Sequence, residues 1–320
     1  MKTIPTLAVL VFAADVAVAD GNPAPAAEAP APQKPLKVLM IGNSFSVCVL
    51  RQMPQIAADL GLPLDICSLY IGGCPLSKHA ANATNETARP YVVSGHYVSA
   101  KEGEEPFRHA LGGKDGRHAN IPAMLAADKW DVVTVQQASH ESWRPESYEP
   151  HGTKLLALVA KLAPQAKVYV QQTWSYTPWD KRLEKWGLTP ETMYGHIEKA
   201  YDAFAKAHGL EQIRMGEAVQ LYRRELPVAY TEKSLGGDVC GRDTFSENNG
   251  KWHHTGDAFH LNARGEYLQG LVWTAKLFGA DVTKSGYVAP ALTNAPERAE
   301  LMRRIAVRVA GAAPAEGKAP

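Results

Sequence analysis

The stretch Lys37-Val38-Leu39-Met40-Ile41-Gly42-Asn43-Ser44-Phe45-Ser46 joins a short apolar run to a glycine, a serine and an amphipathic segment. The apolar run contains β-branched residues and ends at a turn signal, which predicts a buried strand. Apolar residues recur at helical spacing over residues 47–60, and Gly61 follows where a helix C-cap glycine belongs. Ser44 therefore lies at a predicted strand-to-helix turn, where its hydroxyl can project from the edge of a sheet. A turn serine that only caps the helix would give the same local pattern.

Apolar runs and helical patterns alternate through the rest of the chain. Further strands are predicted at residues 64–70, 131–136, 167–172 and 213–215, and helices at residues 121–127, 155–162, 189–208, 216–226, 262–278 and 297–309. Residues 82–116 are polar and read as an excursion from the core, and residues 236–255 as a polar loop. This alternation predicts an α/β fold with a parallel sheet covered by helices on both faces.

Several polar or glycine-containing segments follow directly after the predicted strands. They are Ser44, Gly72-Gly73, Gln136-Gln137 and Gln171-Gln172-Thr173. Active sites of parallel α/β sheets lie outside the carboxyl ends of the strands, so we expect these segments to meet at one site.

The two ends of the chain differ in composition from the middle. Residues 1–19 have the basic start, apolar centre and Ala-Val-Ala ending of a signal peptide, and residues 20–35 form a Pro/Ala-rich linker. We therefore predict a catalytic domain over residues 36–310, a disordered tail over residues 311–320, and a secreted or periplasmic location. No apolar stretch of about 18 residues follows the N-terminus, so no membrane contact is expected after signal cleavage.

Composition and cysteine content narrow the class of protein further. The 320 residues carry a net charge of +1, with 45% hydrophobic and 21% charged residues, which does not indicate a nucleic-acid partner. The four cysteines are Cys48, Cys67, Cys74 and Cys240. Their spacing matches no zinc motif, and the sequence leaves open whether Cys67 pairs with Cys74 or Cys74 with Cys240.

A candidate base for Ser44 lies late in the chain. A serine hydroxyl becomes a good nucleophile when a histidine takes its proton and a carboxylate orients that histidine. Asp257 and His260 are three positions apart, and on a helical turn this spacing puts both side chains on one side. The same segment allows a metal-dependent hydrolase in which His254, Asp257 and His260 are ligands.

Acyl transfer also needs donors for the developing oxyanion. We expect the backbone N–H groups of Ser44 and Gly73 to supply two, and a side-chain amide of Gln136 or Gln137 to supply a third. Plain turn glycines and ordinary polar strand ends would leave the same residues in the sequence.

Taken together, these motifs resemble the SGNH (GDSL-type) hydrolase superfamily, in a subgroup of bacterial proteins with Gly-Asn-Ser as its first block. Gly42-Asn43-Ser44 matches that block, Gly73 the second-block glycine, and Asp257-Ala258-Phe259-His260 the fifth-block D-x-x-H. The resemblance implies a three-layer flavodoxin-like sandwich with a central parallel sheet and no cofactor. It also implies a Ser-His-Asp esterase with Ser44 as nucleophile, His260 as base and Asp257 as its orienting carboxylate.

One block departs from the superfamily pattern. The usual third block, Gly-x-Asn, corresponds here to Gln136-Gln137-Ala138-Ser139-His140, so a glutamine amide or His140 would have to replace the asparagine. This puts the oxyanion hole in question, not the triad.

The predicted export and the substrates typical of the superfamily indicate that the substrate is a small acyl ester, most plausibly an O-acetyl group on a carbohydrate. Tryptophans 143, 174, 179, 186 and 252 fall in predicted loops near the strand ends and are of a kind that stacks on sugars. We expect Asn43, His140, Trp174 and His254 to contact the substrate. A non-catalytic carbohydrate-binding protein on the same scaffold is the remaining alternative, and the sequence does not indicate an oligomeric state.

Overall fold

The computed structural model describes residues 34–101, 104–113, 115–226 and 229–311. The predicted signal peptide, most of the linker and all but the first residue of the predicted tail lie outside the described residues. The boundaries predicted for these segments therefore stay predictions.

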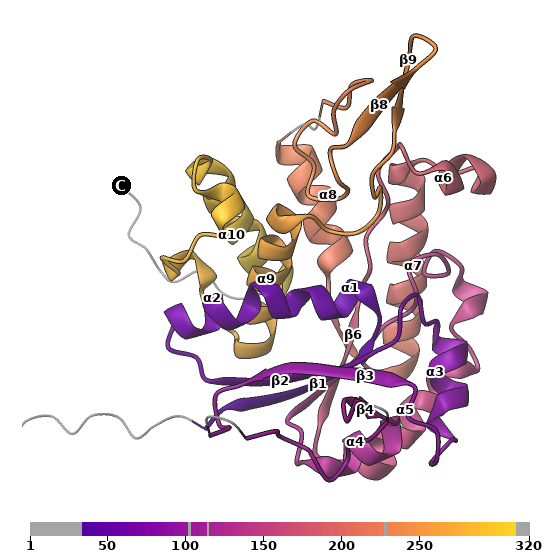
Figure 1. Ribbon diagram of the computed structural model, residues 1–320, viewed down its shortest axis with the longest axis vertical. Helices are drawn as coiled ribbons and strands as arrows, with labels where there is room; N and C mark the ends of the chain where they lie inside the picture. The colour runs from indigo at the N-terminus through magenta and orange to yellow at the C-terminus, as the bar shows by residue number, and fades with distance from the viewer. Residues whose placement is uncertain (1–33, 102–103, 114, 227–228, 312–320) are drawn as a thin grey trace, which may run out of the picture. The chain divides into compact units, whose positions relative to one another are not determined.

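A seven-stranded sheet runs through the domain in the order β4-β3-β2-β1-β5-β6-β7 (Figure 1). Its strands are β1 (Leu36–Gly42), β2 (Leu64–Tyr70), β3 (Tyr91–Tyr97), β4 (His118–Ala119), β5 (Val132–Val135), β6 (Lys167–Gln171) and β7 (Glu211–Ile213). Strands β2, β1, β5, β6 and β7 are parallel, whereas β3 pairs antiparallel with β2 and β4 antiparallel with β3. The parallel strands have the flavodoxin-like order, in which β2 and β5 lie on opposite sides of β1.

Helices cover both faces of the sheet (Figure 1). One face carries α2, α8, α9 and α10, which pack on one another, and the other carries α3, α4, α5 and α7. The helices are α1 (Ser44–Val47), α2 (Met53–Asp59), α3 (Leu76–Ala83), α4 (Ile121–Ala127), α5 (His151–Leu162), α6 (Lys181–Trp186), α7 (Pro190–His208), α8 (Met215–Glu225), α9 (Ala263–Phe278) and α10 (Pro296–Ala310). Short 3₁₀ turns add η1 (Cys48–Arg51), η2 (Pro145–Ser147), η3 (Val282–Lys284) and η4 (Pro290–Leu292). The predicted three-layer α/β sandwich is confirmed.

Two predicted irregular segments contain strands. Residues 82–116 were expected to leave the core, but β3 extends the sheet beside β2, and Tyr91 at its start is fully buried. Residues 236–255 contain the hairpin of β8 (Phe245–Asn248) and β9 (Lys251–His254), which projects from the sheet (Figure 1). Strand β3 has few buried residues and pairs with a strand distant in sequence, and the hairpin strands are polar, so local apolar periodicity reveals neither.

The helix predicted over residues 47–60 is interrupted. The chain forms α1, then η1, then α2, and Pro54 lies in the first turn of α2. Proline lacks the N–H and its ring clashes with the preceding turn, so a helix can begin at Pro54 but cannot run through it. Gly61 has φ of +67° just after α2, as the predicted C-cap glycine requires.

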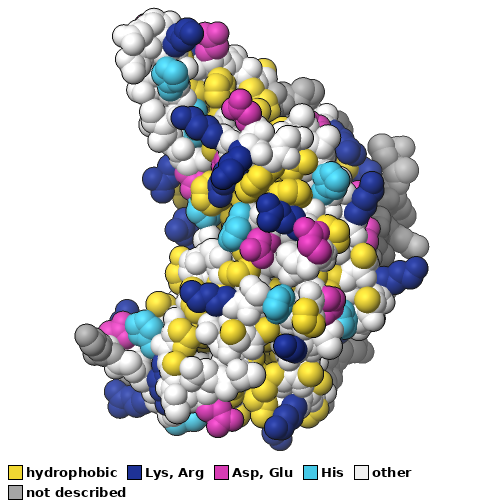
Figure 2. All heavy atoms as spheres, turned by 90° about the vertical axis from the view of Figure 1, so that its right-hand side faces the viewer, with side chains coloured by type: hydrophobic (Ala, Val, Ile, Leu, Met, Phe, Trp, Pro, Cys, Tyr) yellow, Lys and Arg dark blue, Asp and Glu magenta, His cyan; other side chains and the backbone are white. Residues whose placement is uncertain are grey.

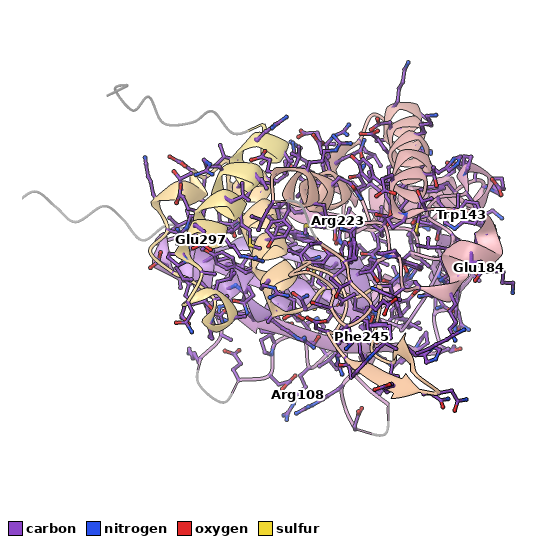
Figure 3. The ribbon with its side chains drawn as sticks, turned by 90° about the horizontal axis from the view of Figure 1, so that it is seen from above. Arg108, Trp143, Glu184, Arg223, Phe245 and Glu297 are labelled. Carbon is purple, nitrogen blue, oxygen red and sulfur yellow. The ribbon has the colours of Figure 1, made fainter. Side chains whose placement is uncertain are left out.

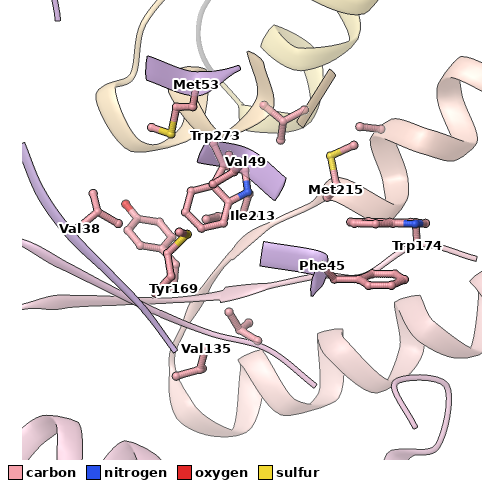
Figure 4. Packing of buried hydrophobic residues seen from close by; sticks show 14 of the residues in the cluster. Val38, Phe45, Val49, Met53, Val135, Tyr169, Trp174, Ile213, Met215 and Trp273 are labelled. Carbon is pink, nitrogen blue, oxygen red and sulfur yellow. The ribbon is translucent and has the colours of Figure 1, made fainter. Parts of the chain in front are cut away.

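The core joins the sheet to the first turn after β1. The rings of Phe45 and Trp174 stack with centroids 4.1 Å apart and planes 14° from parallel, next to Met215 (Figure 4). Trp174, which was expected to face a sugar, is fully buried. An aromatic pair of this kind is worth about 0.5–1.5 kcal/mol beyond the burial of its surface. The stack therefore anchors the residue next to Ser44 to the segment after β6.

The four cysteines form no disulfide, because all four thiols are free in the structure. Burial raises the pKa of the Cys48 and Cys67 thiols to about 12, so they are neutral at ordinary pH. Within the described ranges, none of the helices has the length and apolar character that a bilayer crossing needs.

Candidate active site

Residues 42–46, which we call the nucleophile turn, place Ser44 at the carboxyl end of β1. Asn43 is the N-cap of α1, and its side-chain oxygen accepts hydrogen bonds from the Phe45 N–H (3.0 Å) and from Gln136 Nε2 (2.6 Å). Its Nδ2 donates to the Cys74 carbonyl at 3.1 Å. The turn is therefore tied to the ends of two neighbouring strands. Gly42 makes this packing possible, because a Cβ there would lie 2.3 Å from Ser46 Oγ.

Two further amides hold the nucleophile turn from the opposite side. The Phe45 carbonyl accepts hydrogen bonds from Gln171 Nε2 (2.6 Å), at the end of β6, and from Gln269 Nε2 (2.8 Å), on α9. Both glutamines are fully buried, so these bonds form away from competing water. The backbone beside Ser44 is thus fixed by groups from three parts of the chain.

Residues 255–262, which we call the histidine loop, carry Asp257 and His260 before α9. These residues do not form the helical turn expected from their spacing. Instead, Asp257 Oδ1 accepts hydrogen bonds from the N–H groups of Phe259 and His260, both at 2.9 Å. An aspartate that binds the backbone two residues on closes a tight turn without a helix, and here it brings its second oxygen to the His260 ring.

The side chains of Ser44, His260 and Asp257 form a continuous hydrogen-bonded chain. Ser44 Oγ lies 2.7 Å from His260 Nε2 across 216 residues of sequence, and His260 Nδ1 lies 2.5 Å from Asp257 Oδ2. Burial acts to raise the pKa of the Asp257 carboxyl, but hydrogen bonds from the His260 ring and from the two loop N–H groups outweigh it and hold that pKa well below its usual range. The carboxylate is therefore ionised and only accepts, so Nδ1 carries the proton and Nε2 is free to accept from Ser44.

A second segment braces the histidine loop along its length. The N–H groups of Gly241 and Arg242 donate to the carbonyls of His260 and Asp257, both at 2.7 Å. Gly241 has φ of +83°, and a Cβ there would lie 2.9 Å from the Asp257 carbonyl, so the contact needs glycine. The segment is held in turn by Asp238, whose carboxylate binds Arg223 of α8. Arg223 lies toward the middle of the molecule in the view from above (Figure 3).

The triad opens into a pocket of about 460 Å³. Its walls come from α1 and η1 on one side and from the histidine loop and the start of α9 on the other. The charged lining residues are Arg51, Arg242, Asp257 and Glu266. A pocket of this size is within the range of small-molecule sites.

The expected oxyanion donors are placed unequally. Ser44 N–H lies in the first turn of α1, where N–H groups have no intrahelical acceptor. Gly73 lies in an exposed turn after β2 with φ of +58°, and its N–H has no acceptor among the described residues. Gln136 is buried, and its Nε2 donates a hydrogen bond to Asn43 Oδ1. Gln137 was an incorrect candidate, because its Nε2 donates to the carbonyl and hydroxyl of Ser147, both at 2.9 Å.

Three of the expected substrate contacts are also structural in this fold. Asn43 is 1% exposed and its side-chain atoms are bonded as described above. Trp174 is buried and donates its indole N–H to the Phe259 carbonyl at 2.8 Å. His254 donates from Nε2 to the Arg242 carbonyl at 2.7 Å and packs edge-on against Phe245 (labelled in Figure 3), so it fastens the hairpin instead of facing the triad pocket.

His140 lies in the loop after β5 and does not line the pocket with Ser44. Burial lowers the pKa of its ring, and this outweighs the attraction of Glu141, whose carboxylate is 3.9 Å away. The alternative metal site is not assembled either. The His254 ring is bonded to the Arg242 carbonyl, and the described residues contain no group of three His, Cys, Asp or Glu side chains arranged to hold a metal ion.

The pocket contains residues that the sequence did not single out. Arg51 forms an ion pair with Glu266, which is nearly buried, and Arg242 lies on the segment that braces the histidine loop. Neither arginine stands in a motif or follows a predicted strand, so no local signal marks them. Gln171 and Gln269 both donate to the Phe45 carbonyl. The sequence marks only Gln171, which stands at the end of a predicted strand.

Several solved structures are similar to the chain. A DUF4886 family protein from Bacteroides uniformis is 24% identical, covers 88% of this chain and 98% of its own, and superposes with a TM-score of 0.68. A candidate SGNH hydrolase from Slackia heliotrinireducens (20% identity, coverages 75% and 97%, TM-score 0.47) and a GDSL-like lipase from Bacteroides thetaiotaomicron (13%, 75% and 87%, 0.37) are also similar. The structure from Bacteroides uniformis shares the fold of this chain.

The family follows from the sequence itself. The model of the family described as "Domain of unknown function (DUF4886)" matches residues 37–223, and the chain belongs to this family. The match begins just before the nucleophile turn and ends before the histidine loop. No curated protein matches the chain.

Proposed function

We propose that the protein is a serine esterase that hydrolyses small acyl esters, most plausibly O-acetyl groups on carbohydrates. The observation that carries the proposal is the chain of contacts from Ser44 Oγ to His260 Nε2 and from His260 Nδ1 to the ionised Asp257. A hydroxyl, a base and an orienting carboxylate in this order are the parts that acyl transfer by serine requires.

In the first half of the reaction, Ser44 Oγ attacks the acyl carbon while its proton passes to His260 Nε2. Asp257 stabilises the imidazolium that forms, and the N–H groups of Ser44 and Gly73 are the proposed donors to the oxyanion. The tetrahedral intermediate then breaks its bond to the alcohol, which leaves with the proton from His260. The acyl group remains on Ser44.

In the second half, water attacks the acyl carbon and gives a proton to His260. Collapse of the second intermediate releases the carboxylic acid and returns the proton to Ser44 Oγ. If a sugar hydroxyl took the place of water, the same residues would transfer the acyl group. The product distinguishes hydrolysis from transfer, because only hydrolysis releases free acetate.

The N-terminus and a second pocket bear on the location and the substrate class. The N-terminal signal features favour a secreted or periplasmic protein, and exported acetylesterases meet acetylated polysaccharides. Trp179 and Trp252 line a second, aromatic pocket between α6 and the hairpin, which fits a carbohydrate better than a lipid. These observations support an acetylated sugar as the substrate of the proposed esterase.

The test is a screen of purified protein against acetylated mono- and oligosaccharides with acetate release as the readout, using Ser44→Ala as the matched control. The proposal expects release by the wild type and none above background by the variant. A chelator added to the wild type should have no effect, since the proposed mechanism uses no metal. Release that Ser44→Ala retains, or that a chelator abolishes, would contradict the proposal.

A carbohydrate-binding protein without activity would bind the same sugars and release no acetate. The intact hydrogen-bonded triad favours the enzyme, because a binding protein has no use for a histidine aligned between a serine and an ionised aspartate.

A further inference from the structure

Arg242 is an exposed arginine in the lining of the pocket that contains Ser44 and His260. Within the part of the chain that the structure describes, no carboxylate forms an ion pair with its guanidinium and no aromatic ring lies under it. The guanidinium therefore keeps its five donors available at the mouth of the candidate active site.

The other charged residues that line this pocket already have partners. Arg51 pairs with Glu266, and Asp257 gives its oxygens to the His260 ring and to two loop N–H groups. Among these four lining residues, Arg242 is the one whose side chain has no hydrogen bond or ion pair with another described residue. Figure 2 shows Lys, Arg, Asp and Glu side chains mixed on the face that it views.

The backbone of Arg242 is fixed next to the catalytic loop. Its N–H donates to the Asp257 carbonyl at 2.7 Å, and its own carbonyl accepts from His254 Nε2 at 2.7 Å and from the Thr244 N–H at 2.8 Å. The side chain therefore starts from a defined point beside Asp257. A guanidinium held in this way can select a group on the substrate, whereas one on a mobile loop would add only general attraction.

We propose that Arg242 selects esters whose alcohol part carries a carboxylate, so that the preferred substrate is an acetylated uronic acid or a related acidic sugar. This inference rests on the proposed esterase function and names its substrate class. The guanidinium is planar and matches a carboxylate with two parallel hydrogen bonds, which gives geometric selection beyond charge. In the proposed reaction the acyl group lies at Ser44. The alcohol part of the substrate is therefore the part that reaches Arg242.

The test compares two acetylated substrates that differ only at C6: a mono-O-acetylated methyl glucoside, with a hydroxymethyl group, and the corresponding methyl glucuronide, with a carboxylate. The enzymes are the wild type, Arg242→Gln, Arg242→Lys and the control Arg224→Gln. Arg224 is an exposed arginine on α8 that also lacks a carboxylate partner among the described residues and does not line the pocket. Because the Arg242 contacts within the protein are made by its backbone, Arg242→Gln is expected to melt at the wild-type temperature.

We expect the kcat/KM of the wild type to be about tenfold higher for the glucuronide than for the glucoside. A charge-assisted pair between the Arg242 guanidinium and the substrate carboxylate provides a difference of this size. Arg242→Gln should remove most of this preference, mainly through KM, and Arg242→Lys should restore part of it. Arg224→Gln should keep the wild-type ratio. Added salt should lower the wild-type preference, because it screens exposed charges.

Equal kcat/KM values of the wild type on both substrates, or an unchanged ratio in Arg242→Gln, would overturn the inference and leave the esterase proposal standing. A third substrate is the acetylated methyl glucoside that carries a sulfate at C6. If the wild type prefers this substrate to the acetylated glucuronide, the assignment to a carboxylate is overturned. If no ester is cleaved, the esterase proposal fails. The inference about Arg242 is then tested by measuring the affinity for the glucuronide ester. Ser44→Ala should then bind the glucuronide ester more tightly than Ser44→Ala/Arg242→Gln does, and equal affinities would overturn it.

Discussion

The nucleophile turn and the histidine loop hold the two halves of one hydrogen bond by different means. The nucleophile turn follows a central, buried strand, and buried amides from β5, β6 and α9 fix it. The histidine loop lies outside the sheet and is held by backbone pairing with a segment that is anchored at Asp238 and by the Trp174 indole, which donates to the Phe259 carbonyl. The comparison teaches that the core builds one half of the site, while a peripheral excursion, secured by a buried ion pair, builds the other.

The largest effect should come from breaking the contact between the two halves. We expect Ser44→Ala or His260→Ala to lower the kcat for a chromogenic acetyl ester by roughly 10³–10⁶-fold, and the double variant to lose little more than either single one, because triad members act as a unit. Circular dichroism should show folded protein in each case. Independent losses that multiply in the double variant would show that Ser44 and His260 do not act together.

The next largest effect should come from the anchor of the histidine side. Asp238→Ala leaves Arg223 buried without its partner and should lower the free energy of unfolding by about 3–5 kcal/mol in urea denaturation. The matched control is Glu225→Gln, which breaks the exposed pair with Arg308 and should cost about 1 kcal/mol or less. Equal costs for the two variants would show that burial does not set the value of the Asp238 anchor.

A smaller effect is expected on the nucleophile side. Asn43→Ala removes the N-cap of α1 and orphans the buried Gln136 amide, which should cost about 1–3 kcal/mol. Asn43→Asp keeps the cap and the acceptor for Gln136 but loses the donor to the Cys74 carbonyl, so its stability should lie between that of Asn43→Ala and the wild type. An Asp variant less stable than the Ala variant would contradict this account of the turn.

The smallest effect should be a pH dependence of the histidine side. The pKa of Asp257 is depressed in the folded protein, so below about pH 4 the unfolded chain binds the proton more readily and the wild type loses stability as the pH falls. Asp257→Asn cannot show this loss. The difference in urea midpoint between the two proteins should therefore shrink from pH 7 to pH 3, and a constant difference would remove Asp257 as the cause.

The same contrast explains how much the sequence predicts. The strand before Ser44, the turn after it and the alternation of strands and helices follow from apolar periodicity and glycine placement, which are local signals. The D-x-x-H spacing also marks Asp257 and His260 correctly as neighbours in space. These features are legible because each depends on residues close together in the chain.

What the sequence does not predict depends on tertiary contacts. Strand β3 is ordered by pairing with β2 and β4, and the strands of the β8–β9 hairpin are polar and carry no apolar periodicity. Trp174 and Gln137 stand where a ligand contact is plausible, but burial against Phe45 and hydrogen bonds to Ser147 take them out of reach. Arg242 has no motif, and only the fold brings it to the pocket.

The central claim is that His260 activates Ser44, and a fluorophosphonate probe tests it most directly. We predict that the probe modifies the wild type at one site, found by mass spectrometry in the tryptic peptide of residues 38–51, which contains Ser44 and Ser46. Fragmentation should assign it to Ser44, and His260→Ala should remain unlabelled under the same conditions. Labelling at Ser46 or elsewhere, or equal labelling of Ser44 without His260, would contradict the account.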